Sequence, residues 1–405
     1  MSDRSIAYFT MEIALEDEIP TYSGGLGVLA GDTIRSNADL GIPMVGVTLL
    51  YREGYFEQEL DEEGVQRASP ERWEVSDHLR SLNPHVRVMI GGEEVTVRAW
   101  QYTVEGVEGH TIPIYFLDTD LETNSDWHRS LTTRLYGGDQ RYRMAQEIVL
   151  GIGGVRMLSA LGHSEIERYH MNEGHASFLT LELLNRSAKK RGRGHVTHED
   201  IEQVREQCIF TTHTPVPAGH DRFDQGLVRE LFEPNDDLVE MDAILYDGQE
   251  LNMTELALDL SQYVNGVAKK HGEVSRNMFD GYEIDSITNG VHLPSWTSPP
   301  FKELFDRYIP GWEIDNFSLR HALSIPRDEI WDAHRRAKEN LLDYVNAHTE
   351  ADLNPEVFTV GFARRAATYK RADLLFDDMD RLRRIAREVG PFQLVFSGKA
   401  HPADE

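Results

Sequence analysis

The sequence predicts an α/β fold with two domains, each built around a mostly parallel sheet. Short β-branched runs alternate with longer helical patterns, as in consecutive βαβ units. A length of 405 residues exceeds what one hydrophobic core usually organises. The strand–helix alternation also restarts near residue 356, after a purely helical stretch, and this restart predicts a second sheet.

The first half of the chain supplies the clearest elements. Residues 6–10 (IAYFT) predict a strand, and the glycine-rich segment 22–27 predicts a turn. A helix ending at Gly41 and a strand over 43–51 follow. Alternating runs between residues 56 and 120 predict hairpins, with Gly91–Gly92 as the clearest turn.

The remaining elements follow in order. The expected elements are a buried helix over 141–158, a strand over 208–214, a long helical region over 255–279 broken at Gly266 and Gly272, helices within 301–350, and strands over 356–365 and 392–398. The predicted domains are 1–270, 271–350 and 351–405. Because two strands cannot bury both faces of a parallel sheet, we expect the last domain to be incomplete and the chain to be truncated.

Charge and composition restrict the partners. The formal net charge is −28, which disfavours binding to nucleic acid or to anionic membranes. No apolar run reaches the roughly 18 residues of a membrane span, and the acidic start does not match a secretory signal. The single cysteine, Cys208, lies in an apolar run and predicts a buried thiol in a reducing cytoplasm.

Two features predict binding of an anion. The first is Ser23-Gly24-Gly25-Leu26-Gly27, because backbone N–H groups at a helix start attract phosphate, although a purely structural turn remains an alternative. Its spacing differs from the G-x-G-x-x-G dinucleotide motif. The second is 364–371 (RRAATYKR), four cations in eight residues, placed at a strand end and a helix start. A solvated helix face paired with the acids that follow is its alternative.

Histidines mark a third segment, 211–215 (TTHTP), at the end of a predicted strand and close to His220 and Asp221. A structural or capping role is the simple interpretation of one such histidine. The nearby set His170, Glu173 and His175 misses the spacings of known zinc motifs, so we predict no metal site.

Taken together, these segments resemble the α-glucan (glycogen, starch or maltodextrin) phosphorylases. The resemblance runs through FTMEIAL, YSGGLGVLAGD, LYGGDQRYRMAQE, NEGH, TTHTPVPAGHD, SQYVNGVA, ITNGVHLPSW, FARRAATYKR and SGKAHPAD. It implies two Rossmann-like domains of the glycosyltransferase-B type, the second incomplete in this chain. The early position of FTMEIAL resembles the short form that lacks a regulatory N-terminal extension.

The resemblance also implies a reaction and roles for residues. Phosphate would cleave a terminal α-1,4-glucosyl unit and give glucose 1-phosphate with retention, assisted by pyridoxal phosphate. Arg365 and Lys370 would hold the substrate phosphate, with Arg364 close to the cofactor and Gly24 and Gly25 donating N–H groups.

The sugar would be held elsewhere. His213 would offer its backbone carbonyl to the glucosyl unit, and Asn265 would bind sugar hydroxyls. Asp139 would occupy a gate-loop position, although the asparagine-rich version of the family differs here. Glu173 and His175 correspond to a less direct stretch, and a homodimer is the family habit.

The cofactor lysine of the family lies in a C-terminal motif that these 405 residues lack. The chain alone is therefore expected to be inactive. The alternatives are a nucleotide-sugar-dependent glucan synthase of the same architecture and a non-catalytic glucan-binding fragment.

Overall fold

The computed structural model describes residues 4–216, 219–232, 239–246 and 248–400. Contacts divide the chain into two compact units, residues 1–56 with 70–291 and residues 57–69 with 292–405, and each is described by itself. The predicted three-part division stays a prediction. Among the described residues, no helix has both the length and the apolar character required to cross a membrane.

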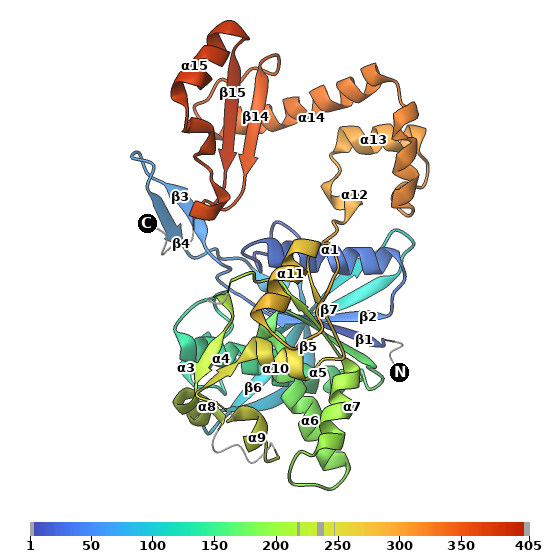
Figure 1. Ribbon diagram of the computed structural model, residues 1–405, viewed down its shortest axis with the longest axis vertical. Helices are drawn as coiled ribbons and strands as arrows, with labels where there is room; N and C mark the ends of the chain where they lie inside the picture. The colour runs from blue at the N-terminus through green and yellow to red at the C-terminus, as the bar shows by residue number, and fades with distance from the viewer. Residues whose placement is uncertain (1–3, 217–218, 233–238, 247, 401–405) are drawn as a thin grey trace. The chain divides into compact units, whose positions relative to one another are not determined.

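The first unit is built on a nine-stranded mixed sheet in the spatial order β13-β12-β9-β8-β1-β2-β7-β6-β5 (Figure 1). The pairs β5–β6 and β6–β7 are antiparallel and the other pairs are parallel. Its strands are β1 (Ile6–Thr10), β2 (Met44–Leu49), β5 (Arg80–Ile90), β6 (Glu93–Glu105), β7 (Thr111–Asp118), β8 (Arg168–Asn172), β9 (Cys208–Thr212), β12 (Tyr263–Gly266) and β13 (Asp285–Ser286). The predicted α/β class with a mostly parallel sheet is thus confirmed for this unit.

Helices and a short hairpin complete the first unit. The helices are α1 (Gly25–Asp39), α2 (Val75–His78), α3 (Asp126–Ser130), α4 (Gln140–Ile148), α5 (Gly154–Ala160), α6 (Phe178–Lys190), α7 (His198–Gln207), α8 (Gln225–Phe232), α9 (Asp242–Leu245), α10 (Met253–Asp259) and α11 (Lys269–Met278). The hairpin pairs β10 (Arg222–Asp224) with β11 (Glu250–Asn252). The predicted turn at Gly91–Gly92 is confirmed, and both glycines have positive φ.

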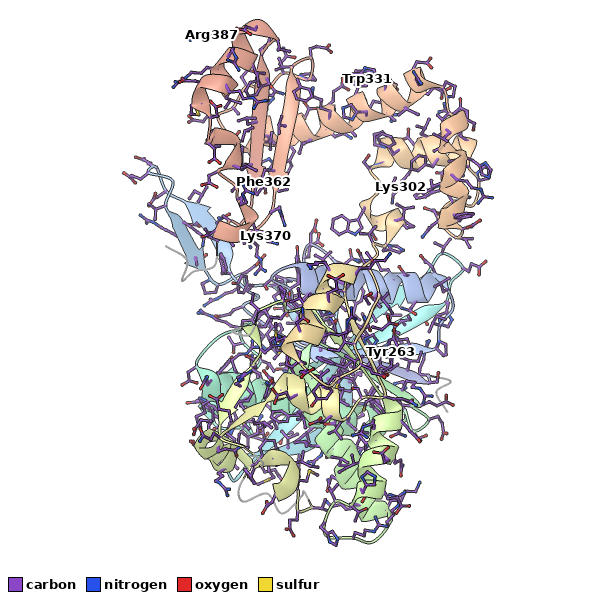
Figure 2. The ribbon with its side chains drawn as sticks, in the orientation of Figure 1. Tyr263, Lys302, Trp331, Phe362, Lys370 and Arg387 are labelled. Carbon is purple, nitrogen blue, oxygen red and sulfur yellow. The ribbon has the colours of Figure 1, made fainter. Side chains whose placement is uncertain are left out.

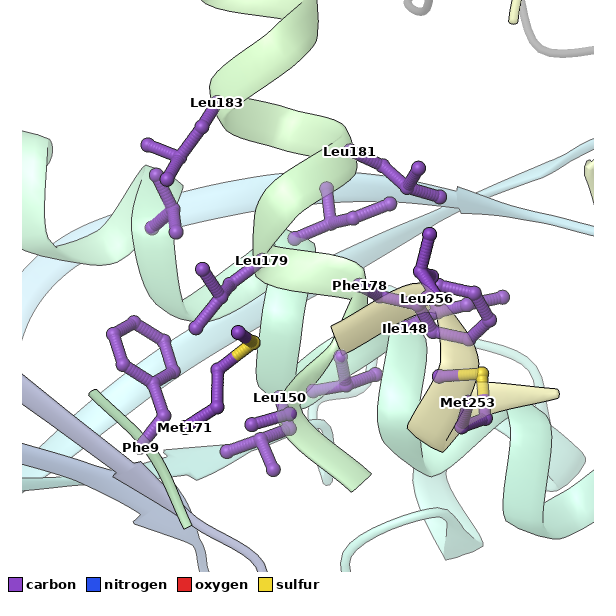
Figure 3. Packing of buried hydrophobic residues seen from close by; sticks show 14 of the residues in the cluster. Phe9, Ile148, Leu150, Met171, Phe178, Leu179, Leu181, Leu183, Met253 and Leu256 are labelled. Carbon is purple, nitrogen blue, oxygen red and sulfur yellow. The ribbon is translucent and has the colours of Figure 1, made fainter. Parts of the chain in front are cut away.

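Both faces of the sheet are covered. Phe9 on β1 and Met171 on β8 are register partners and lie beneath α6, where they meet Leu179 and Leu150 (Figure 3). The preceding residue of β1, Tyr8, points to the opposite core, which α1 covers. Because successive side chains of a strand alternate between faces, a strand buried on both sides needs the continuous apolar run found here.

Two glycines fix α1 against the segment that follows β1. A Cβ at Gly31 would lie 1.9 Å from the carbonyl oxygen of Ala14, and one at Gly27 would lie 2.8 Å from Oε2 of Glu12. No side chain fits at such distances. The glycine-rich turn is therefore held directly beside the end of β1, as the strand–turn–helix prediction required.

The predicted helical region over 255–279 is wrong in its middle. Residues 263–266 form β12, which pairs in parallel with β9 and β13. Gly266 ends that strand, and Gly272 lies inside α11, where its missing side chain admits Ser286 and Asp285. Pairing with these parallel neighbours makes residues 263–266 a strand, because it buries Val264 and Asn265. The segments on either side in the sequence are helix-forming.

The predicted helix over 141–158 is present and buried, but a π-helical turn over Val149–Gly153 separates α4 from α5. Close approach of α6 accounts for a glycine there, since a Cβ at Gly151 would lie 2.5 Å from the backbone of Leu179. Cys208 is a free, buried thiol, as predicted.

The second unit contains a two-stranded parallel sheet of β14 (Phe358–Ala363) and β15 (Phe392–Ser397). Figure 1 shows α15 (Met379–Glu388) beside these strands. The other elements are β3 (Glu57–Leu60), β4 (Gln66–Ser69), α12 (Leu293–Trp296), α13 (Pro299–Tyr308), a 3-10 segment (Asn316–Ser324) and α14 (Arg327–His348). Both predicted strands of this unit are confirmed.

The basic segment differs from its prediction. It follows β14, but no α-helix begins there. Residues 368–370 form one 3-10 turn, Arg371 adopts a left-handed conformation with φ of 56°, and α15 begins only at Met379. A left-handed residue interrupts helical propagation, which explains the later start.

Candidate active site

The chain order of the strands creates a switch point between β1 and β8. From β1 the chain adds β2 and β7 on one side, then returns to place β8, β9 and β12 on the other. Connections that diverge in this way open a crevice at the carboxyl ends of the two central strands, where α/β proteins bind ligands. The polar groups at this edge are therefore the first candidates for a site.

Thr10 and Asn172, the last residues of β1 and β8, are linked across the switch point. Asn172 Nδ2 donates to Thr10 Oγ1 at 3.1 Å, and this fixes which end of the amide accepts. Asn172 Oδ1 then accepts from Nε2 of His213 at 2.6 Å. The predicted site residue His213, just beyond β9, is thus oriented by the neighbouring strand in a single tautomer.

Glu173 holds the backbone around His213. Its Oε2 accepts the N–H of His213 at 2.8 Å and the hydroxyl of Thr214 at 3.0 Å. Glu173 is 4% exposed and has φ of 73°, a conformation that costs a non-glycine residue about 1–3 kcal/mol. Such strain persists where the surroundings over-determine it, as these bonds do here.

Asn265 joins the same group of residues. The Nε2–H of His170 donates to Thr211 Oγ1 at 2.8 Å, and that hydroxyl donates to Oδ1 of Asn265 at 3.0 Å. Asn265 is 5% exposed, and its Nδ2 donates to the carbonyl of Gly266. The structure therefore brings the predicted residues His213 and Asn265 to the same sheet edge, on adjacent strands.

His170 and His213 are neutral at pH 7. Burial lowers the pKa of His170 to about 4, and the neighbouring His213 adds to the effect. Burial also lowers the pKa of His213 to about 4, although Glu173 opposes the shift. Burial alone would raise the pKa of Glu173, but its contact with His213, whose backbone N–H it accepts, helps to lower the pKa below its ordinary value. The edge thus combines an ionised carboxylate with neutral imidazoles.

The glycine-rich turn already holds a carboxylate of the protein. Glu12 Oε2 accepts the N–H groups of Ser23 and Gly24 at 2.6 and 3.1 Å. The predicted donor Gly24 is therefore engaged. The next residue, Gly25, opens α1, and a side chain there would meet nothing within 4 Å. Gly25 is thus the predicted glycine that leaves space for a ligand at the first turn of the helix.

An ionic network continues from Glu12 to the far side of the edge. Tyr136 donates its hydroxyl to Glu12 Oε1 at 2.7 Å, and the guanidinium of Arg143 lies 4.6 Å from the centre of the Tyr136 ring. Arg143 also bonds Asp221 Oδ2 at 2.7 Å, and His175 Nε2 lies 3.2 Å from that oxygen. Five groups from separate segments therefore form one network beside the turn.

Asp139 takes a different role in the structure. Its side chain is exposed and accepts the N–H of Tyr142 at 2.9 Å, so that it caps α4. This capping fixes the start of the helix that carries Arg143. Substrate binding by Asp139 stays a prediction.

The basic residues lie in the second unit. Arg364 and Arg365 are exposed just beyond β14. Lys370, labelled in Figure 2, is half-buried at the end of the 3-10 turn. The backbone N–H of Arg364 donates to the carbonyl of Ser397 at 3.0 Å, so β15 fixes the start of this loop. A phosphate site shared with the glycine turn stays a prediction.

Some motif residues lie outside the described part of the chain: Pro217 and Ala218 of TTHTPVPAGHD, and residues 401–404 of SGKAHPAD. Over the described ranges, no group of three or more histidine, cysteine or acidic residues is placed to hold a metal ion.

Sequence reasoning missed several residues of this edge. Glu12, Tyr136 and Arg143 occur in the sequence only as members of longer motifs, and Asp221 only as a neighbour of His220. One signal was available for Glu12, which is an acid inside an apolar run directly after a strand. The partners of the others lie 78 to 124 residues away and could not be inferred from spacing.

Comparisons of the sequence with known proteins point to one family. The carbohydrate phosphorylase model matches residues 9–133, which include the end of β1, the glycine turn and α1. A maltodextrin phosphorylase of Thermococcus litoralis is 35% identical over 100% of this chain and 52% of its own length. A glycogen phosphorylase of Mycobacterium tuberculosis is 37% identical over 99% of this chain and 52% of its own length. An uncharacterized protein of Methanocaldococcus jannaschii is 34% identical over 98% of this chain and 70% of its own length.

The chain belongs to the carbohydrate phosphorylase family. The predicted resemblance is confirmed, and these matches do not favour a nucleotide-sugar synthase. The chain spans about half the length of the phosphorylases named above. The large mixed sheet with its switch-point edge agrees with the phosphorylase type of α/β fold.

Proposed function

We propose that this chain carries the glucan-binding part of an α-1,4-glucan phosphorylase. The reaction breaks the glycosidic bond between C1 of a terminal glucosyl unit and O4 of the next one. An oxygen of inorganic phosphate bonds to C1, O4 receives a proton, and the product is α-glucose 1-phosphate. Family membership and the chemistry of the switch-point edge together support this proposal.

The bond between Glu173 and the N–H of His213 is the observation that carries the proposal. Glu173 holds the N–H of His213 and the hydroxyl of Thr214, and so fixes the backbone on both sides of the His213 carbonyl. A carbonyl oxygen held in one orientation stabilises positive charge that develops at C1 in the transition state. The neutral ring of His213 does not oppose that charge.

Asn265 would contribute to recognition of the sugar. Its side chain is buried on β12 and bonded to Thr211. A fixed amide offers both a donor and an acceptor to sugar hydroxyls. Loss of one such bond leaves a polar group unpaired, which accounts for selectivity between sugars.

Phosphate recognition is assigned to Arg365, Lys370 and Gly25. Guanidinium and ammonium groups bind phosphate by charge-assisted hydrogen bonds, and a helix N-terminus adds backbone donors. The exposed position of Arg365 and the open space at Gly25 leave both accessible to a ligand.

Pyridoxal phosphate is the cofactor that the family implies. Arg364 and the first turn of α1 offer donors of the type that a cofactor phosphate requires, so these residues fit the group. When bound, its 5′-phosphate would supply a proton relay. The residues of this chain would hold that phosphate.

The test is incubation of the full-length gene product with maltodextrin and inorganic phosphate, and separately with maltodextrin and a nucleotide-glucose. We expect glucose 1-phosphate in the first reaction and no elongation of the glucan in the second. Elongation by the nucleotide-glucose, without glucose 1-phosphate from the first reaction, would contradict the proposal.

A further inference from the structure

Glu147 is a fully buried acid without a conventional partner. It lies on α4 with 0% exposure, and neither carboxyl oxygen receives a hydrogen bond from the described residues. The closest cation, Arg143 Nη2 one helical turn earlier, is 3.7 Å from Oε1, beyond hydrogen-bond distance. An ionised carboxylate in such a place would be costly.

A second carboxyl, that of Asp221, lies at the same guanidinium nitrogen as Glu147: Arg143 Nη2 is 3.7 Å from Oε1 of Glu147 and 2.7 Å from Oδ2 of Asp221. Asp221 is well supplied with donors, since Arg143 Nη2 bonds its Oδ2 at 2.7 Å and His175 Nε2 lies 3.2 Å from the same atom. Two carboxylates that share one cation repel each other, whereas one proton between them makes a strong hydrogen bond. Burial of Glu147 beside a guanidinium that it shares with Asp221 therefore favours a bound proton.

We propose that Glu147 is protonated at neutral pH and donates this proton to Asp221, which makes Glu147 a positioning residue for Asp221 between Arg143 and His175. Arg143 in turn lies over the ring of Tyr136, whose hydroxyl holds Glu12. The proton thus supports the side of the active site that contains the glycine-rich turn.

The environments of the two acids assign the proton to Glu147. Burial, and then the negative charge of Asp221, raise the pKa of Glu147 well above its ordinary value, and Arg143 only partly opposes them. Burial would raise the pKa of Asp221 as well, but His175 and Arg143 together lower it below its usual range. Tyr51 is a further ionisable neighbour, and because burial raises its own pKa it stays neutral.

The first test is the pH dependence of unfolding in Glu147→Gln. A glutamine amide donates to Asp221 without a titratable proton. Because the folded-state pKa of Glu147 is raised above its ordinary value of 4.5, the proton is lost on unfolding at higher pH. Between about pH 5 and 7 we expect the wild type to lose stability relative to the variant, about tenfold in the unfolding equilibrium per pH unit, or ~1.4 kcal/mol. Parallel stability curves would overturn the proposal.

Glu182→Gln is the matched control. Glu182 is also buried on a helix, but its carboxylate receives Arg156 and Arg186 at 3.0 and 2.8 Å. This substitution removes ion pairs, so we expect Glu182→Gln to be less stable than the wild type. Unlike Glu147→Gln, it should not gain stability relative to the wild type as the pH rises. The same gain in Glu182→Gln would assign the effect to burial of any glutamate and would overturn the assignment to the pair.

A second measurement uses only the wild-type protein and so does not depend on whether a variant folds. Infrared difference spectra of the wild type, or carbon-13 shifts of labelled glutamate carboxyls, distinguish a protonated acid from a carboxylate. We expect one glutamate carboxyl to stay protonated at pH 7 in the native protein and to ionise on unfolding. Only ionised glutamates at pH 7 would overturn the proposal.

The proton itself does not depend on the proposed function, but its effect on turnover does. In the full-length protein, Glu147→Gln should retain phosphorolysis and Glu147→Leu should reduce it about tenfold or more, since the leucine cannot donate. A Leu variant as active as the Gln variant would overturn the positioning role. Absence of phosphorolysis in the wild type would instead contradict the proposed function and leave the spectroscopic test unaffected.

Discussion

The carboxylate of Glu173 accepts the backbone N–H of His213 at 2.8 Å, and in this way β8 controls the conformation of the loop that follows β9. Each residue lies just past the end of its strand, so the bond joins two segments that are 40 residues apart in sequence. The positive φ of Glu173 is the conformational cost of this arrangement.

Glu173→Gln should reduce turnover more than substrate affinity. The neutral amide weakens a hydrogen bond to a charged acceptor, and such bonds contribute roughly 1.5–3 kcal/mol. If the bond is needed in the transition state, kcat for phosphorolysis should fall about 10- to 100-fold with KM for the glucan little changed. An unchanged kcat in a folded variant would remove Glu173 from the site.

The stability of the protein should depend on the neutrality of His213. Its pKa is about 4 in the folded state against an ordinary value of 6.5, so the unfolded chain binds more protons between these limits. Stability contributed by neutral His213 is therefore present above about pH 6.5 and is lost as the pH falls toward 4.

The quantity to measure is the difference between wild type and His213→Gln, because Glu147 contributes in the opposite direction. We expect this difference in unfolding free energy to fall by up to about 1.4 kcal/mol per pH unit on acidification from pH 6.5. A difference independent of pH would show that His213 titrates normally.

Arg365→Ala and Lys370→Ala should each raise the KM for phosphate in the full-length protein. Loss of one charge-assisted contact costs about 2 kcal/mol, which corresponds to roughly 30-fold. Arg387→Ala on α15 is a control, since it removes an exposed cation of the same unit outside the basic segment. An equal effect in the control would indicate a general loss of positive charge.

Gly25→Ala and Gly27→Ala distinguish a glycine that leaves room for a ligand from one that close packing requires. A Cβ at Gly25 meets nothing within 4 Å, so the alanine variant should fold with unchanged or slightly higher stability. If Gly25 adjoins the phosphate, the KM of the Gly25→Ala variant for phosphate should still rise. Gly27→Ala should instead destabilise the protein, because its Cβ would lie 2.6 Å from Cβ of Tyr22. Normal phosphate kinetics in Gly25→Ala would assign the turn a structural role only.

Much of the fold was predictable because its signals are local. The apolar run IAYFT, the glycines at 24, 25 and 27, and the pair Gly91–Gly92 each specify an element within a few residues. β12 was not predictable in the same way. Its four residues are surrounded by helix-forming segments, and only the parallel strands β9 and β13 give them an extended partner.

The site was predictable in part for the same reason. His213 stands in a local motif at a strand end, and Asn265 was named through the family resemblance. The assignment of Gly24 as a free donor did not include Glu12, because nothing local indicates that this acid folds back onto the turn. The proposed hydrogen bond from Glu147 to Asp221 joins two segments 74 residues apart and depends on burial, which spacing does not reveal.

The most direct test of the central claim is a nuclear magnetic resonance time course of the full-length protein with maltodextrin and inorganic phosphate. We predict that α-glucose 1-phosphate forms first, in proportion to the phosphate consumed, and that free glucose does not accompany it. Release of glucose without loss of phosphate, or formation of the β anomer, would contradict phosphorolysis with retention.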